Sequence, residues 1–227
     1  MSSSSTCFHS DIILFYKYFS TSIHEKLSKD NEAADSILKF IENLCHKFSL
    51  RGRLIFASEG INGTLSGLDK ECLMRFVSNM EQFSFMDVKL FCDIDWKWSQ
   101  ATSQTLVFPD LYVAKSKEIV SSGNAINLEE LSKFKGKHLS PHEFHSIIGA
   151  KDNKKEIVLI DVRNTFEHAI GHFETPSGGK AIDPSMVTFS TFDSSFCAKN
   201  ASTLQDKKVL MYCTGGIRYV KQNDCFY

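Results

Sequence analysis

A cysteine, two glycines and an arginine stand close together in the stretch CTGGIR, residues 213–218. The apolar run KVLM comes shortly before them, so Cys213 is expected to close a buried strand. Ligands of open α/β sheets bind at the carboxyl ends of strands, which makes this cysteine a candidate catalytic residue. The residues expected to bind substrate around it are Thr214, Gly215, Gly216, Ile217 and Arg218.

The residues after Cys213 indicate what this loop can do chemically. Small side chains allow successive backbone N–H groups to curl into a concave site that binds anions. A helix is expected to begin at Ile217, and its first turn adds positive potential. Such surroundings lower the pKa of a thiol and favour the nucleophilic thiolate. The thiolate can attack sulfur and hold it as a persulfide, while Arg218 pairs with an anionic sulfur donor such as thiosulfate.

The spacing between Cys213 and Arg218 separates two kinds of cysteine chemistry. Arg218 is the sixth residue counted from Cys213, which gives the pattern C-x-x-x-x-R. Cysteine phosphatases have one residue more, because their loop surrounds a tetrahedral phosphate. The shorter loop favours a sulfur atom carried on the cysteine. A buried cysteine in a glycine turn is the structural alternative.

A second candidate strand, EIVLID at residues 156–161, ends in Asp161 and is followed by Arg163. In one interpretation Arg163 or His172 lines the pocket of the cysteine. In the other, Asp161, Arg163 and Glu167 form hydrogen bonds and ion pairs that brace the loops. The bracing interpretation is favoured, because buried charges at strand ends are usually paired.

The elements that must position these residues form two patterns along the chain. The first is strand, helix, strand, strand, helix, strand, which is the split βαβ order of an α+β, ferredoxin-like domain. Its first and last strands are expected near residues 12–19 and 83–91, and its helices at 31–48 and after Asp69. The two middle strands are expected within residues 53–67, with a tight turn at Asn62-Gly63.

The second pattern begins near His138. Ser140, Pro141 and Glu143 predict a capped helix, and the strands at 156–161 and 208–213 predict an α/β unit with a parallel sheet. The resulting division is a disordered tail at 1–10, a ferredoxin-like domain at 11–95, a connector at 96–137 and an α/β domain at 138–227. Pro109 favours an edge strand or a linking segment within the connector.

Composition narrows the class of protein. The 227 residues have a formal net charge of −1, which gives no bulk attraction to nucleic acid or to anionic membranes. Seven cysteines, an odd number without a C-x-x-C pair, favour a reduced intracellular protein. The apolar stretch near the start is too short to cross a bilayer, and the first arginine is Arg51, which argues against a mitochondrial transit peptide. The expected location is the cytoplasm, with no membrane partner.

Other clusters carry weaker signals. His138, His142 and His145 have no nearby cysteine, so neither a metal nor another cofactor is expected. The turn at residues 60–63 favours a structural role, with contact to RNA through Glu59 as the alternative. The two tryptophans, Trp96 and Trp98, can pack in the core or stack on unpaired bases, and packing is favoured.

Three segments resemble a known family. LIDVRNTFEHAIGHF and VLMYCTGGIR are similar to the rhodanese domain, a sulfurtransferase module. GRLIFASEGINGTLSG resembles the N-terminal signature of one rhodanese-containing family. Its bacterial members are tRNA uridine hydroxylases that make 5-hydroxyuridine at the wobble position, and its eukaryotic members are thiosulfate sulfurtransferase/rhodanese-like domain-containing proteins. The resemblance covers about residues 12–218 and implies a ferredoxin-like domain followed by a rhodanese domain, with Cys213 as the persulfide-forming or otherwise essential cysteine.

The chain departs from the family pattern in two places. Family members usually have a second cysteine directly after the arginine, where this sequence has Tyr219. The rhodanese module normally continues into a full helix, another strand and a closing helix, whereas this sequence ends at Tyr227. These departures predict a C-terminally truncated rhodanese domain with reduced stability and weak or absent activity.

The main functional interpretation is a rhodanese-type sulfurtransferase or sulfur carrier that forms a persulfide at Cys213. One alternative is hydroxylation of the wobble uridine of tRNA. The other is a non-catalytic protein whose rhodanese fold binds RNA or protein. The expected partners are a small anionic sulfur donor and, for the alternatives, tRNA, while the sequence leaves the oligomeric state open.

Overall fold

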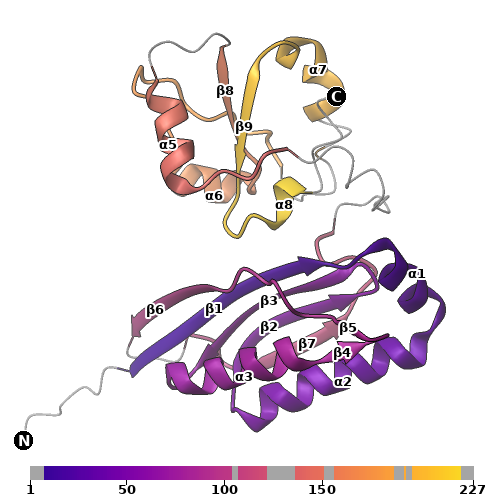
Figure 1. The fold of residues 1–227 in the computed structure, drawn as a ribbon. Coiled ribbons are helices and arrows are strands. Elements are labelled where there is room, and N and C mark those ends of the chain that lie inside the picture. Colours follow the sequence, from indigo (N-terminus) through magenta and orange to yellow (C-terminus); the bar gives the residue numbers. More distant parts are fainter. Residues whose placement is uncertain are drawn as a thin grey trace, which may run out of the picture. The chain divides into compact units, whose positions relative to one another are not determined.

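The structure, a computed structural model, describes residues 8–103, 107–121, 136–150, 156–186, 192 and 196–220. The chain divides into two compact units, Met1–Ile119 and Val120–Tyr227 (Figure 1). The described part of each unit has its own buried core. Within the described residues, no helix combines the length and the apolar character needed to cross a bilayer.

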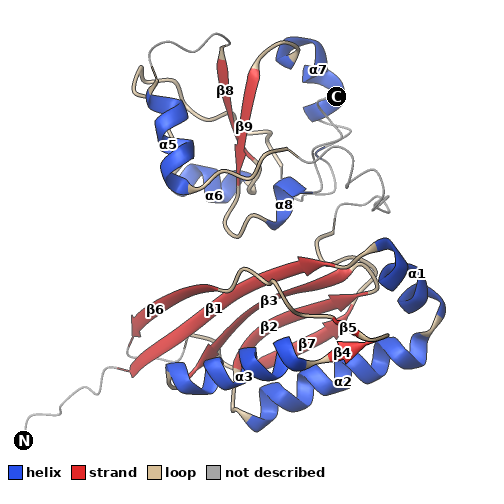
Figure 2. Ribbon diagram, viewed as in Figure 1, coloured by secondary structure: helices blue, strands red, loops and turns tan. Residues whose placement is uncertain are grey.

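The first unit is a five-stranded sheet with helices packed on one face (Figures 1 and 2). The strand order is β6-β1-β3-β2-β7, antiparallel throughout except for the parallel pair β2 and β7. The strands are β1 (Phe8–Tyr18), β2 (Arg51–Ala57), β3 (Gly60–Gly67), β6 (Lys97–Ser103) and β7 (Leu111–Lys115). The helices are α1 (Thr21–Lys29), α2 (Asn31–Lys47) and α3 (Lys70–Gln82).

The helices of this unit form where apolar residues recur at helical spacing. In α2 the buried positions are Ala34, Ile37, Ile41, Leu44 and Cys45, which confirms the predicted amphipathic helix. The predicted cap of α3 is also confirmed, since the Asp69 side chain accepts a hydrogen bond of 2.8 Å from the Cys72 amide. Both apolar faces pack against the sheet in one core.

The last strand of the predicted βαβ order lies later in the chain than expected. Residues 83–91 do not form one strand, and the prediction was wrong there. They form a small hairpin, β4 (Ser84–Phe85) and β5 (Val88–Lys89), turned by Met86 and Asp87 at positive φ. The strand that completes the sheet is β6, inside the segment interpreted as a connector, and β7 also belongs to this sheet. Both are edge strands, which need little apolar alternation, so the sequence signal was weak.

Two further candidates of the first unit have structural roles. Glu59 is buried, and its carboxylate accepts a hydrogen bond of 2.7 Å from the Ile119 amide, so it is not an exposed RNA contact. Trp96 packs on Phe15 with ring centroids 4.6 Å apart, as the packing interpretation predicts. Trp98 lies on edge strand β6 and remains 40% exposed.

The second unit contains a parallel pair, β8 (Ile157–Asp161) and β9 (Lys208–Tyr212), with helices α5 (Pro141–Gly149), α6 (Thr165–Ile170), α7 (Ala198–Leu204) and α8 (Ile217–Val220). Alternate residues of β8 enter different cores. Leu159 packs in the cluster that contains Phe144 of α5, whereas Ile160 packs in the cluster that contains Leu204 of α7. Burial on both faces explains why these strands are continuous apolar runs.

The start of this unit follows the sequence prediction. Ser140 accepts a hydrogen bond from the Glu143 amide, and the Glu143 carboxylate accepts one from the Ser140 amide, which confirms the predicted capping box.

Several predictions fall wholly or partly outside the described residues. Of the expected tail at 1–10, residues 1–7 are not described, while residues 8–10 begin β1. Residues 122–135 of the expected connector and residues 221–227 after α8 are also outside, and with them the cysteine at position 225.

Candidate functional site

The predicted site residues meet where β8 and β9 end. The two strands are parallel and in register, with Asp161 beside Tyr212, so their carboxyl ends share one edge of the sheet. Cys213 follows β9 directly, and α8 begins at Ile217, as the sequence predicts. The loop from Cys213 to Arg218 therefore lies at the edge where ligands of α/β sheets bind.

The thiol of Cys213 is half-buried and packs against the cluster that contains Met186 and Phe196. The Gly216 amide donates a hydrogen bond of 3.0 Å to its Sγ. Gly216 has φ +85°, a conformation that favours glycine. Within the loop, Gly215 is buried and Thr214 is exposed. The sulfur is thus held by a main-chain donor but not sealed from solvent.

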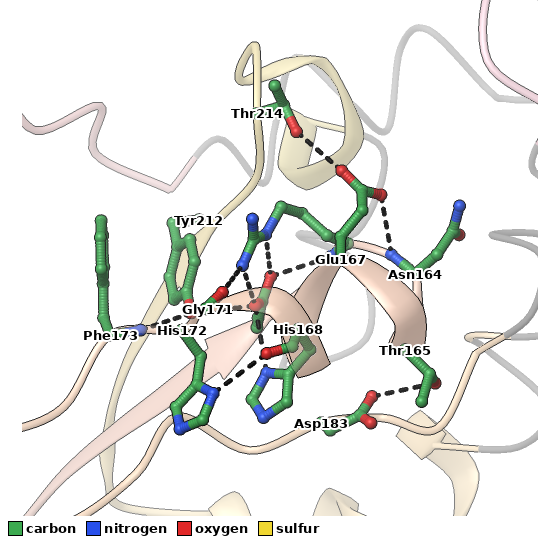
Figure 3. Close-up of polar contacts among 12 residues, drawn as sticks. Asn164, Thr165, Glu167, His168, Gly171, His172, Phe173, Asp183, Tyr212 and Thr214 are labelled. Atoms are coloured by element: carbon green, nitrogen blue, oxygen red, sulfur yellow. Dashed lines mark hydrogen bonds and ion pairs between the residues drawn. The ribbon is translucent and has the colours of Figure 1, made fainter.

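The carboxylate of Glu167, on α6, contacts both ends of this loop, and Figure 3 shows its contacts with Thr214 and Asn164. Its Oε1 accepts a hydrogen bond of 3.0 Å from the Thr214 hydroxyl, and its Oε2 lies 3.1 Å from Nη1 of Arg218. Oε2 also accepts a hydrogen bond of 3.1 Å from the Asn164 amide. Burial raises the pKa of Glu167, but the Asn164 amide, the Arg218 charge and the Thr214 hydroxyl outweigh it and hold the pKa below its usual value.

Asp161, the last residue of β8, has no exposed surface and accepts several hydrogen bonds. It accepts hydrogen bonds from Arg163 Nε at 2.8 Å and Nη2 at 2.7 Å, from the Tyr212 hydroxyl at 3.0 Å and from His168 Nδ1 at 3.1 Å. Burial raises the pKa of Asp161, but these donors outweigh it and lower the pKa below its usual value. Asp161 and Arg163 therefore brace the end of β8 against β9.

The sequence did not single out Tyr212. Its hydroxyl donates to Asp161 and accepts a hydrogen bond of 3.0 Å from the Phe173 amide, and its ring stacks on Phe173 with centroids 4.2 Å apart. Burial raises the pKa of Tyr212 to about 12. The signal that identifies it is its register beside Asp161, which only strand pairing reveals.

Two histidines stand next to this network. The rings of His168 and His172 stack with centroids 4.2 Å apart and planes 8° from parallel. Nδ1 of His172 donates to the carbonyl oxygen of His168 at 3.1 Å, so its described contacts are with its own segment. Arg163, the other residue predicted to line the pocket, donates to the carbonyl oxygen of Gly171 at 2.5 Å and is held by Asp161.

The histidines that were weighed as metal ligands lie on and before α5. His142 and His145 belong to the helix, and His138 precedes it. Across the residues that the structure describes, no three His, Cys, Asp or Glu side chains are grouped to hold a metal ion.

Comparison with known proteins adds the relatives of the chain. Residues 10–119 match the family model of the UPF0176 acylphosphatase-like domain. A tRNA uridine(34) hydroxylase of Aster yellows witches'-broom phytoplasma (strain AYWB) is 36% identical over 180 residues, which cover 78% of this chain and 51% of the relative. The tRNA uridine(34) hydroxylase of Enterococcus faecalis (strain ATCC 700802 / V583) is 32% identical over 213 residues, which cover 92% of this chain and 57% of the relative. The chain is therefore similar in sequence to proteins named tRNA uridine(34) hydroxylase.

The similarity to these hydroxylases extends across both units. The relative from Onion yellows phytoplasma (strain OY-M) is 31% identical over 210 residues, or 92% of this chain, which is more than either unit contains. The chain in turn spans between 51% and 59% of the length of these three relatives. Their shared name agrees with the alternative of wobble uridine hydroxylation and not with the main interpretation as a sulfurtransferase.

Proposed function

We propose that this protein takes part in the hydroxylation of uridine 34, the wobble nucleotide of tRNA. The observation that carries the proposal is the alignment of both units with proteins named tRNA uridine(34) hydroxylase. The proposed substrate is tRNA and the proposed product is 5-hydroxyuridine. The chain spans only 51% to 59% of the length of these relatives. The first experiment therefore asks whether this chain, without any added segment, supports the hydroxylation.

We further propose that the second unit is a rhodanese-type domain in which Cys213 is the catalytic residue. Its support is the placement of the thiol at the end of β9, half-buried and held by the Gly216 amide at 3.0 Å. Asp161 and Arg163 support the loop from below through their ion pair of 2.7 Å. The proposed substrate-binding loop consists of Thr214, Gly215, Gly216, Ile217 and Arg218.

Complementation tests both parts of this proposal. A bacterial strain deleted for its own tRNA uridine(34) hydroxylase receives the chain, and 5-hydroxyuridine in digested tRNA is measured by mass spectrometry. The expected result is restored 5-hydroxyuridine with the unchanged chain and none with Cys213→Ser. The matched control is Cys72→Ser, which changes a partly buried cysteine of α3 and should retain the product. A folded, expressed chain that restores nothing contradicts the proposal.

Sulfur transfer is the second candidate function, favoured by the Gly216 N–H that points at Sγ. In the proposed step the Cys213 thiolate attacks the outer sulfur of thiosulfate. A new S–S bond forms to the cysteine, the S–S bond of thiosulfate breaks, and sulfite leaves with the bonding electrons, so charge and atoms balance. The mass of the intact protein should rise by one sulfur atom, with release of sulfite, except in Cys213→Ser. Sulfur uptake without 5-hydroxyuridine favours a sulfur carrier, and tRNA binding without either favours a non-catalytic protein.

A further inference from the structure

Arg218 is the cationic side chain of the cysteine loop, and the structure shows it already engaged. Its Nη1 lies 3.1 Å from Oε2 of Glu167, and the same carboxylate accepts a hydrogen bond from Thr214 at 3.0 Å. Arg218 and Thr214 stand on opposite sides of Gly215 and Gly216, so one carboxylate of α6 spans the loop beside Cys213. An anion that approaches the sulfur therefore meets a charge pair in which Arg218 is neutralised.

The ion pair between Arg218 and Glu167 is partly exposed. The side chains of Arg218 and Glu167 are 24% and 21% exposed, so water or a ligand can reach both. Glu167 also keeps a partner when Arg218 leaves, because its Oε2 accepts the Asn164 amide at 3.1 Å. That main-chain hydrogen bond satisfies the carboxylate on its own helix, which reduces the free energy needed to separate it from Arg218.

We propose that Glu167 is a positioning residue that withholds Arg218 from anions until an anionic group of the substrate displaces its carboxylate. Displacement frees the Arg218 guanidinium for the incoming anion and releases Thr214 from Oε1 at the same time. Substrates that present a phosphate are favoured over free small anions, because a polyanion such as tRNA competes with the carboxylate at high local charge. This last role rests on the proposed function, whereas the contact between Glu167 and Arg218 is a property of the folded chain.

Alkylation of Cys213 by a charged and by a neutral reagent tests this proposal. If Glu167 only stabilised the fold, replacing it would not change the preference of Cys213 for the anionic reagent. Iodoacetate is an anion and iodoacetamide is neutral, and both react with a cysteine thiolate by forming a C–S bond and releasing iodide. The ratio of their two rate constants at Cys213 cancels the intrinsic reactivity of the thiol. Peptide mass spectrometry of the full chain measures this ratio at Cys213, with Cys72 of the other unit as an internal reference.

A double-mutant cycle isolates the coupling between Glu167 and Arg218. Glu167→Gln should raise the iodoacetate preference at Cys213 by about three- to tenfold, because it leaves Arg218 unpaired. Arg218→Gln should lower the preference in the unchanged background, because it leaves the Glu167 carboxylate unpaired beside the loop. It should lower the preference more in the Glu167→Gln background, where it removes an unpaired cation that binds the anion directly. The matched control is Glu156→Gln, which removes the same charge before β8, at the strand end far from Asp161.

Equal effects of Arg218→Gln in both backgrounds would overturn the proposal, because independent charges act additively. So would a Glu167→Gln ratio equal to that of Glu156→Gln. Should Glu167→Gln fail to fold, Glu167→Asp keeps the charge but shortens its reach, and the same rise, only smaller, is expected. Alkylation does not require hydroxylation, so failure here leaves the proposed function standing, and absence of 5-hydroxyuridine leaves this inference standing.

Discussion

At the scale of single residues, Asp161 decides whether the site holds together. A carboxylate with no exposed surface is costly to bury unless donors surround it, and Arg163, Tyr212 and His168 supply them. These three donors come from the turn after β8, from β9 and from α6. One carboxylate thereby joins the elements on which Cys213 and Glu167 stand.

Replacing Asp161 by asparagine should destabilise the second unit by about 3 kcal/mol, because it breaks a buried ion pair and leaves Arg163 without its partner. Urea unfolding followed by circular dichroism measures the change. Both tryptophans, Trp96 and Trp98, belong to the first unit, so the tryptophan fluorescence transition should stay in place. Glu156→Gln, with the same loss of charge at a surface pair with Lys207, is the control and should cost little. Equal costs for the two variants would contradict the role assigned to Asp161.

The second unit should also lose stability in acid. Asp161 and Glu167 both have pKa values below their usual range in the folded chain. A carboxyl group of lowered pKa contributes stability that is present above its unfolded pKa, about 4, and is lost as the pH falls through the folded value. Unfolding midpoints measured from pH 6 downward should therefore fall below about pH 4. In Asp161→Asn this decline should be shallower, and an unchanged slope would argue against the network as its source.

The sequence identified some of these residues and missed others for a physical reason. Cys213, Asp161 and Arg163 are recognisable because a polar residue directly after an apolar run marks the end of a strand. Glu167 was expected to brace the loops, and it does, but its particular partners Thr214 and Arg218 depend on how far α6 reaches toward the loop. Tyr212 was missed, because its contacts depend on strand register. Both quantities are set by tertiary packing, and no local pattern records them.

At the scale of elements, the first sheet depends on a close approach between β2 and β3. Gly52 has φ +141°, and a Cβ placed there would lie 2.1 Å from the carbonyl oxygen of Thr64. No side chain fits without moving the backbone of the neighbouring strand.

Gly52→Ala should therefore destabilise the first unit by about 2 kcal/mol or more, through strain and displaced backbone. Tryptophan fluorescence during urea unfolding reports on this unit. The control is Gly149→Ala at the end of α5, where an added Cβ meets nothing within 4 Å. That change should leave the fluorescence transition unaltered. If the Gly52→Ala protein is as stable as the unchanged chain, the backbone of β3 near Thr64 can move to accommodate the added Cβ at little cost.

Helices and strands could be predicted from the sequence where one buried face makes apolar residues recur at regular spacing. They could not be predicted where little of the element is buried. The helix α2 and the capped helices α3 and α5 follow from apolar spacing and from Asp69 and Ser140. The edge strand β6 did not follow, because KWSQATS has little apolar content and pairs with β1 on one side only. Residues 83–91 look like a strand by composition, but Met86 and Asp87 turn the chain there.

At the scale of the whole molecule, the described residues of each unit form buried apolar clusters of their own, one in the first unit and two in the second. The first unit encloses Phe15, Leu54 and Phe76 between its sheet and its helices, and the segment after β7 is tied to it by the hydrogen bond from Ile119 to Glu59. The sequence indicated two domains from the change in pattern near His138. The sequence did not predict that β6 and β7 belong to the sheet of the first domain, because neither strand has apolar residues at regular spacing.

Residues 1–119 expressed alone should fold, because every strand of the five-stranded sheet lies within them. The expected result is one cooperative fluorescence transition with the midpoint that this unit has in the full chain. A fragment that gives a broad transition, or a midpoint far below that of the full chain, would mean that the second unit contributes to its stability. Alkylation of Cys45, which is buried in this core, should stay slow in the fragment and provides a second measure of folding.

The hydroxyl of Tyr212, held between Asp161 and the Phe173 amide, makes the second unit sensitive to alkali as well. Its pKa is raised to about 12, so the folded chain keeps a proton that the unfolded chain releases near pH 10. Stability from this tyrosine is complete below pH 10 and declines as the pH rises from there to about 12. The chain has six tyrosines, so the phenolate absorbance of Tyr212 is obtained as the difference between the unchanged chain and a Tyr212→Phe variant. Early appearance of that difference signal during an alkaline titration would report that the strands beside Cys213 have come apart.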